Sequence, residues 1–169
     1  KKGQKIGLVG ESGSGKSTLL NIIMGLIDPS SGQLCIDNKN ISQFKSEWLA
    51  NIGYVPQKIY LADDSIKSNI AFGLTDDEIN TSKIEKSTVN ANLKKFIESL
   101  KNGYSYGVGE FGNKISGGQA QRVGIARAYY KSSEVIILDE ATNALDTDNE
   151  DKIIKIINKN EDSKTFVIV

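Results

Sequence analysis

The stretch Gly10-Glu11-Ser12-Gly13-Ser14-Gly15-Lys16-Ser17-Thr18 fits the pattern G-x-x-x-x-G-K-[ST] at every fixed position. The apolar residues 6–9 before it predict a short buried strand, and residues 19–24 after it predict a helix. A strand, a glycine-rich loop and a helix in this order are what a phosphate-binding loop requires. A chance glycine-rich turn would need neither flanking element. The sequence therefore predicts that residues 10–18 bind a nucleoside triphosphate.

The residue types in this glycine loop (residues 10–18) suit a chain of phosphates. Gly10, Gly13 and Gly15 can adopt positive φ and allow the backbone to approach an anion closely. Backbone N–H groups at the start of the helix add the positive end of the helix dipole. We expect Lys16 to reach the β- and γ-phosphates and the Ser17 hydroxyl to bind Mg²⁺.

Composition narrows the class of protein. The chain has 169 residues, enough for one domain with a core, and its formal net charge is zero. Zero net charge gives no broad electrostatic surface for nucleic acid. No apolar run reaches the roughly 18 residues of a membrane-spanning helix, and no signal peptide is visible. Cys35 is the only cysteine, so it has no partner for an internal disulfide, and there is no histidine.

Both ends of the chain suggest an incomplete domain. The first residue is not methionine and lies very close to the first predicted strand. The last residues, 165–169, have an apolar strand pattern and nothing follows them. We expect the domain to continue on both sides.

The first part of the chain alternates between predicted helix and strand. The apolar helix of residues 19–27 should end at Asp28-Pro29, because proline cannot continue a helix. Strand pieces follow at Leu34, Ile36 and Ile41 around a turn at Asp37-Asn38, then a strand at residues 52–55.

Residues 63–107 are more polar. Residues 63–66 and 75–78 resemble helix starts with acidic first turns, and residues 91–100 predict an amphipathic helix. This block predicts an all-helical insertion between two α/β portions.

A second glycine-rich segment, Ser116-Gly117-Gly118-Gln119, precedes a predicted helix at residues 120–130. Ser116 could simply cap that helix. Capping does not account for two glycines and a glutamine at a helix start, where glycine is unfavourable by up to about 1 kcal/mol. We therefore predict a second anion site at this helix start.

Two acidic residues follow the apolar strand of residues 135–138. Ligands bind at the carboxyl ends of strands in open α/β sheets. Asp139 is suited to the Mg²⁺ shell, and Glu140 to orienting the attacking water. The alternative is a strand that happens to end in two acids. Farther on, Ile153, Ile154, Ile156 and Ile157 form one apolar helix face, which predicts core packing.

Taken together, the chain resembles the nucleotide-binding domain of an ABC transporter ATPase over nearly its whole length. Residues 10–18 match the Walker A loop, and Tyr54-Val55-Pro56-Gln57 resembles the Q-loop. Residues 115–119 resemble the signature LSGGQ, with isoleucine for leucine and Ala120 where arginine or lysine is common. Residues 135–140 resemble Walker B with the catalytic glutamate, and residues 144–146 resemble the D-loop. These motifs occur in the family's order.

The resemblance implies an α/β fold: a P-loop NTPase core of RecA type with a mostly parallel sheet, a small antiparallel β portion and an inserted helical subdomain. Residues 1–169 would form one ABC ATPase domain. Residues 1–58 and 129–169 would be its nucleotide-binding core. Residues 59–128 would be the helical subdomain, ending in the signature helix.

The resemblance also implies a site with ATP and Mg²⁺. Lys16, Gln57 and Glu140 would be catalytic, and Ser17, Gln57 and Asp139 would hold the metal. A second nucleotide-binding domain would pair head to tail, so that ATP lies between Walker A of one domain and the signature of the other. The signature residues contacting the nucleotide would be Ser116, Gly117, Gly118 and Gln119.

Two further segments resemble exporters within this family. Residues 64–70 match the exporter pattern of a hydroxyl residue, isoleucine, two variable positions and Asn-Ile, and residues 108–112 resemble the segment near the coupling helices. The resemblance implies export or flipping of a substrate at the cytoplasmic face of the cell membrane, with transmembrane domains as partners. The family's adenine-stacking aromatic and switch histidine lie outside this sequence, so the chain alone should be weakly active or inactive.

Two alternatives remain. A soluble ABC-type ATPase acting on nucleic acid or ribosomes would need a long coiled-coil insertion or a second domain in tandem, and the spacing from Gln57 to Ser116 leaves no room for the insertion. A P-loop binding module without catalysis would not need Glu140. We expect no nucleic acid partner; the substrate and the identity of the paired domain stay open.

Overall fold

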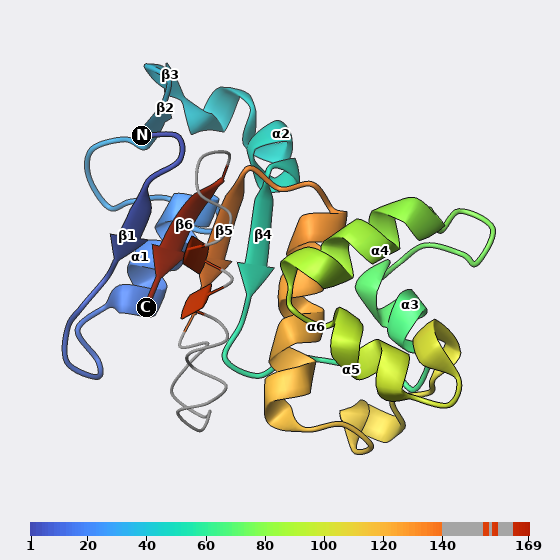
Figure 1. Ribbon diagram of the computed structural model, residues 1–169. Helices are drawn as coiled ribbons and strands as arrows, with labels where there is room; N and C mark the ends of the chain where they lie inside the picture. The colour runs from blue at the N-terminus through green and yellow to red at the C-terminus, as the bar shows by residue number, and fades with distance from the viewer. Residues whose placement is uncertain (140–153, 156, 159–163) are drawn as a thin grey trace.

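A computed structural model describes residues 1–139, 154–155, 157–158 and 164–169. Its centre is a four-stranded sheet in the order β1 (Lys5–Gly7), β6 (Thr165–Ile168), β5 (Val135–Leu138) and β4 (Ile52–Val55). All three strand pairings are parallel. Figure 1 shows this sheet on one side of the molecule and a block of helices beyond β4 on the other. The predicted α/β fold with a mostly parallel sheet is confirmed.

Successive residues of the inner strands pack on opposite faces of the sheet, as the pleat requires. Ile52, Ile137 and Val167 form one apolar cluster with helix α1 (Lys16–Met24). Ile136 and Phe166 belong to a second cluster, shared with the helices on the other face. β1 lies at the edge of the sheet and its side chains are exposed, so the prediction of a buried first strand is wrong.

α1 ends earlier than predicted. Its last residue is Met24, and Gly25 follows with φ 74° and donates its N–H to the Asn21 and Ile22 carbonyls. Glycine adopts this left-handed conformation without strain, so it ends the helix before Asp28-Pro29 can do so.

The small antiparallel β portion is present as β2 (Cys35–Ile36) and β3 (Lys39–Asn40). Asp37 and Asn38 both have positive φ and form the predicted turn between the strands. Ile41 is not in a strand: it begins the 3₁₀ helix η1 (Ile41–Gln43), which leads into α2 (Lys45–Ala50).

The longest helix of the helical block is α6 (Gly117–Tyr130), whose side chains are mostly buried between β4 and the other helices. α6 packs closely on β4, because a Cβ built at Gly53 would lie 2.5 Å from the Cβ of Ala128. The other members of the block are α3 (Ile66–Ile70), α4 (Thr81–Asn90), α5 (Lys94–Ser99), η2 (Gly103–Ser105) and η3 (Glu110–Gly112). The predicted boundary at 128/129 falls inside α6, two residues before its end; the division into core and helical subdomain stays a prediction.

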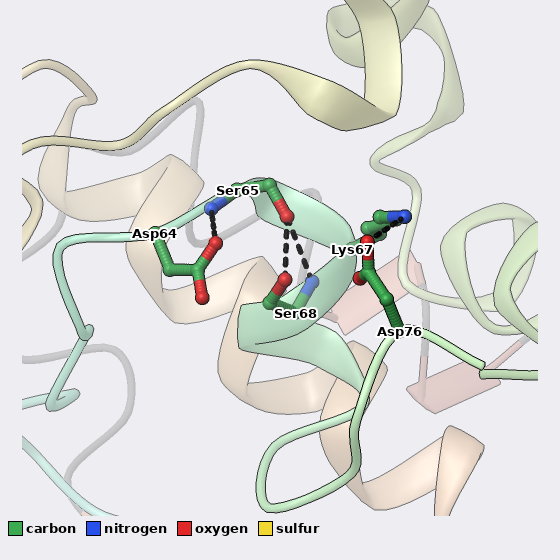
Figure 2. Close-up of polar contacts among 5 residues, drawn as sticks. All are labelled: Asp64, Ser65, Lys67, Ser68 and Asp76. Atoms are coloured by element: carbon green, nitrogen blue, oxygen red, sulfur yellow. Dashed lines mark hydrogen bonds and ion pairs between the residues drawn. The ribbon is translucent and has the colours of Figure 1, made fainter. Parts of the chain in front are cut away.

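The first predicted helix start in this block is confirmed, but its two acidic residues precede the helix instead of lying in its first turn. The Ser65 hydroxyl accepts a hydrogen bond from the Ser68 N–H at 3.1 Å and caps α3. Figure 2 shows this cap together with the ion pair between Lys67 and Asp76, whose Nζ and Oδ2 are 3.0 Å apart.

The other two helix starts are wrong. At residues 75–78 the Thr75 N–H and hydroxyl both donate to the Glu78 carboxylate, which closes a turn instead of a helix. Helix α4 begins after Asn80, whose side chain accepts from the Lys83 N–H at 2.9 Å. The helix predicted from residue 91 begins at Lys94, because Asn92 adopts positive φ.

Of the apolar face predicted near the end of the chain, Ile157 is buried in the core and Ile154 is exposed. Ile153 and Ile156 lie outside the described residues. No helix in the described part of the chain is long and apolar enough to cross a membrane.

Candidate active site

The glycine loop has the conformation that the sequence predicts at two of its three glycines. Gly13 and Gly15 have φ of 79° and 91°, a region that side chains rarely allow. Gly10 does not have positive φ, which corrects the expectation for that residue. Glycine fits at position 10 because a larger residue would lack space: a Cβ there would lie 2.7 Å from the Ser14 hydroxyl oxygen.

Lys16 folds back over this loop. Its ammonium donates to the Gly10 carbonyl at 2.8 Å and to the Glu11 carbonyl at 2.9 Å. Beside it is a hollow of about 250 Å³, lined by Ser12, Gly13, Gly15, Lys16, Ser17 and Thr18. The first N–H groups of α1 have no partner within the helix and open at this hollow. The loop therefore concentrates donors and one cation around a concave surface.

Asp139 lies at the same carboxyl end of the parallel strands as the glycine loop, since both directly follow strands of this sheet. It directly follows β5, and its N–H donates to the Val55 carbonyl at 3.0 Å. One carboxylate oxygen, Oδ2, accepts a hydrogen bond from the Tyr54 hydroxyl at 2.8 Å. Burial, then the hydrogen bond to Asp139 and its negative charge, raise the pKa of Tyr54 to about 12. The phenol therefore keeps its proton at neutral pH and acts as the donor.

The prediction from sequence missed Tyr54. Tyr54 is two residues after Ile52 in a predicted strand, and this spacing indicates only that the two side chains lie on the same face of the strand. Nothing in the sequence shows that β4 pairs with β5, and that pairing places Tyr54 next to Asp139. Gln57 is exposed and follows β4 by two residues, at the carboxyl end of that strand.

The Ser116 segment (residues 115–119) begins α6 with a capping box. The Ser116 hydroxyl accepts from the Gln119 N–H at 3.3 Å, and the Gln119 side chain accepts from the Ser116 N–H at 2.7 Å. Capping thus accounts for the glutamine, contrary to the argument from sequence. Gly117 is exposed, and a Cβ there would meet no atom within 4 Å. Packing therefore does not account for Gly117.

The structure separates the two predicted phosphate-binding segments. The glycine loop follows β1 at one edge of the described sheet, whereas α6 packs on β4 at the opposite edge. β6 and β5 lie between them (Figure 1). Glu140 and residues 144–146 lie outside the described residues.

Comparison with known proteins identifies the family. A sequence model of the family described as "ABC transporter" matches residues 1–143. The chain belongs to the ABC transporter family. Its fold is that of the family's ATPase domain, a P-loop NTPase fold.

Individual ABC proteins resemble the chain over almost all of its length. It is 41% identical over 168 residues to "ABC transporter B family member 21" of Arabidopsis thaliana and 39% identical over 168 residues to "ATP-dependent lipid A-core flippase" of Saccharophagus degradans. A solved structure of a bacterial Atm1-family ABC exporter with ATP bound superposes with a TM-score of 0.87, at 35% identity and over 99% of this chain.

These ABC proteins are much longer than the chain. Each match includes 99% of this chain. The matched region makes up only 13% of the Arabidopsis protein, 28% of the flippase and 30% of the exporter chain. The relatives thus contain large regions with no counterpart in these 169 residues.

Proposed function

We propose that this chain is the ATP-binding and ATP-hydrolysing domain of an ABC exporter, which pairs head to tail with a second such domain. The observation that carries the proposal is the separation of the glycine loop and the Ser116 segment at opposite edges of one sheet. Each segment presents helix N–H groups suited to phosphate, and their separation in one chain argues against both binding the same ATP within it. A head-to-tail pair would complete two sites.

Within each site we assign the Walker A residues to the triphosphate. Lys16 would exchange its two loop carbonyls for the β- and γ-phosphate oxygens, which are stronger acceptors because they are charged. The N–H groups of residues 13–18 would surround the phosphates. From the second domain, the Ser116 hydroxyl and the N–H groups of Gly117 and Gly118 would contact the γ-phosphate.

We assign the metal to the Ser17 hydroxyl, the Asp139 carboxylate and the Gln57 amide oxygen. Oxygen ligands of this kind fit Mg²⁺, and Asp139 keeps one carboxylate oxygen that Tyr54 does not bind. Bound there, Mg²⁺ would neutralise charge on the phosphates. We assign Glu140 to orienting the attacking water, with Gln57 beside it.

The membrane partner would dock on an exposed aromatic patch of the helical block, formed by Tyr60, Phe72 and Phe111. These side chains are 58%, 56% and 73% exposed. Their rings contact edge to face: the centre of the Tyr60 ring is 6.2 Å from that of Phe72 and 6.4 Å from that of Phe111. Arg127 stacks 4.8 Å from the Phe72 ring centre and donates to the Tyr60 carbonyl at 2.7 Å. Clustered exposed aromatics are typical of interaction sites.

The patch lies beside both exporter-like segments, since Phe72 follows residues 64–70 and Phe111 belongs to residues 108–112. We therefore place the domain at the cytoplasmic face of a membrane, held to transmembrane domains of the whole protein. Closure of the paired domains on ATP would pull on these transmembrane domains and drive export.

The test uses the full-length protein in detergent with Glu140→Gln. The amide keeps the shape of the side chain and removes its charge, so hydrolysis should become very slow while ATP still binds. After gel filtration we expect two ATP molecules to remain per pair of domains. Adding Ser116→Arg should abolish this retention, because the bulky cation would occupy the place of the γ-phosphate. Hydrolysis by Glu140→Gln at the wild-type rate, or ATP retained by the double variant, would contradict the proposal.

A further inference from the structure

Tyr54 contacts the predicted metal ligand through one specific hydrogen bond. Its hydroxyl donates to Oδ2 of Asp139 at 2.8 Å. Tyr54 is 43% exposed, so its ring is not part of the buried core. Packing would be served equally well by a phenylalanine at this position, and the hydroxyl adds a contact that packing does not require.

The contact follows from how the two strands pair. Tyr54 of β4 lies opposite Ile137 of β5, and Asp139 is two residues beyond Ile137, on the same face of the sheet. The hydrogen bond from the Asp139 N–H to the Val55 carbonyl extends the ladder by one residue and fixes the Asp139 backbone. The Tyr54 hydroxyl then removes the remaining freedom, which is rotation of the carboxylate.

This face of the sheet is also the one covered by α1. Ile52 and Ile137, which flank Tyr54 on the face, pack in one cluster with Leu20 and Met24 of α1. α1 starts at the glycine loop and carries Ser17 in its first turn. Tyr54 therefore holds Asp139 on the side of the sheet where the loop and Ser17 lie.

We propose that Tyr54 is a positioning residue for Mg²⁺: it holds the Asp139 carboxylate by Oδ2 and leaves Oδ1 directed for the metal or a metal-bound water. This inference rests on the proposed function, which assigns Asp139 to the metal. Carboxylates that bind metals are usually oriented by a hydrogen-bond donor, and loss of such a donor typically lowers metal affinity about 10- to 100-fold.

The experiment measures how Mg²⁺ supports binding of the fluorescent nucleotide MANT-ATP to the full-length protein. Tyr54→Phe keeps the ring and removes only the hydroxyl. We expect the Mg²⁺ concentration at half-maximal effect to rise about tenfold or more. MANT-ATP binding in EDTA should equal that of the wild type, because the glycine loop is intact.

Two controls separate positioning from a general structural effect. Tyr104→Phe also removes a tyrosine hydroxyl contact, the 2.9 Å contact with the Thr88 hydroxyl in the helical block, and should leave the Mg²⁺ dependence unchanged. In an Asp139→Asn background, adding Tyr54→Phe should cause no further shift, because the ligand it positions is already lost.

The outcomes distinguish this inference from the proposed function. Absence of MANT-ATP binding to the wild-type protein would contradict the proposed function. Binding that responds to Mg²⁺ equally in wild type and Tyr54→Phe would overturn the role of Tyr54 alone. A Tyr54→Phe shift that persists with Asp139→Asn, or an equal loss of binding in EDTA, would also overturn it.

Discussion

At the scale of single residues, the surroundings of Lys16 are those expected of a side chain that binds an anionic ligand. Its ammonium is held by two backbone carbonyls of its own loop, beside a hollow lined by loop residues and the first residues of α1. Neutral carbonyls are weaker partners for a cation than phosphate oxygens. The lysine is therefore positioned in advance at the place where the triphosphate would bind.

Lys16→Ala should lower the affinity for MANT-ATP in EDTA about 10- to 100-fold, since hydrogen bonds to charged groups contribute about 1.5–3 kcal/mol. A fluorescence titration of the full-length protein measures it. Lys45→Ala is the matched control: it removes an exposed ion pair to Asp28 at the far end of α1, with Nζ 3.1 Å from Oδ1, and should change nothing. Equal affinity for Lys16→Ala and wild type would refute the assignment of the loop.

At the scale of elements, the contact between α6 and β4 determines where the Ser116 segment lies. Gly53 allows this contact, because a Cβ there would approach both the Cβ and the backbone Cα of Ala128, at 2.5 and 3.0 Å. Ala128 lies on α6 and cannot move away without moving the whole helix. The position of the signature helix thus depends on a glycine in a strand.

Gly53→Ala should lower the free energy of unfolding by about 1–3 kcal/mol, the usual effect of overpacking. Urea unfolding of the 169-residue chain, followed by the fluorescence of Trp48, its single tryptophan, measures the change. Gly7→Ala is the control, since a Cβ at that strand glycine meets no atom within 4 Å. We expect it to change stability by less than about 0.5 kcal/mol. Equal stability of the two variants would show that Gly53 does not set this contact.

The elements also show how far the sequence predicts the structure. The strand at 135–138 is predictable because it is a continuous apolar run of the kind that central strands require, and those at 52–55 and 165–169 because they are short, mainly apolar segments. The cap at Ser65 is a local hydrogen bond and is equally readable. Residues 75–78 carry the same acidic signal, but the Thr75 contacts to Glu78 close a turn, and no local pattern distinguishes the two outcomes.

Only part of the candidate site can be predicted from sequence, namely the part that consists of contiguous motifs. The glycine loop and the Ser116 segment are contiguous motifs, so their chemistry is visible in the residue order. Tyr54 is not, because its relation to Asp139 depends on the neighbouring positions of β4 and β5 in the sheet. The order β1-β6-β5-β4 places strands side by side that are far apart in sequence, and it is a property of the fold as a whole.

For the whole molecule, the central claim is that two nucleotide-binding domains share each ATP site, here tested for two copies of one chain. Lys16→Ala damages only the Walker A side, and Ser116→Arg damages only the signature side. Each variant alone would form pairs in which both sites are defective. A mixed pair would contain one site with both halves intact and one site with both halves defective, because the pairing is head to tail.

The decisive measurement is therefore the ATPase rate of purified mixed pairs. The two full-length variants are expressed together with different affinity tags, and mixed pairs are isolated by both tags in succession. We predict almost no hydrolysis by either variant alone and recovery of about half the wild-type rate in the mixed pair, which has one complete site of two. Mixed pairs as inactive as the separate variants would contradict a site shared between two chains.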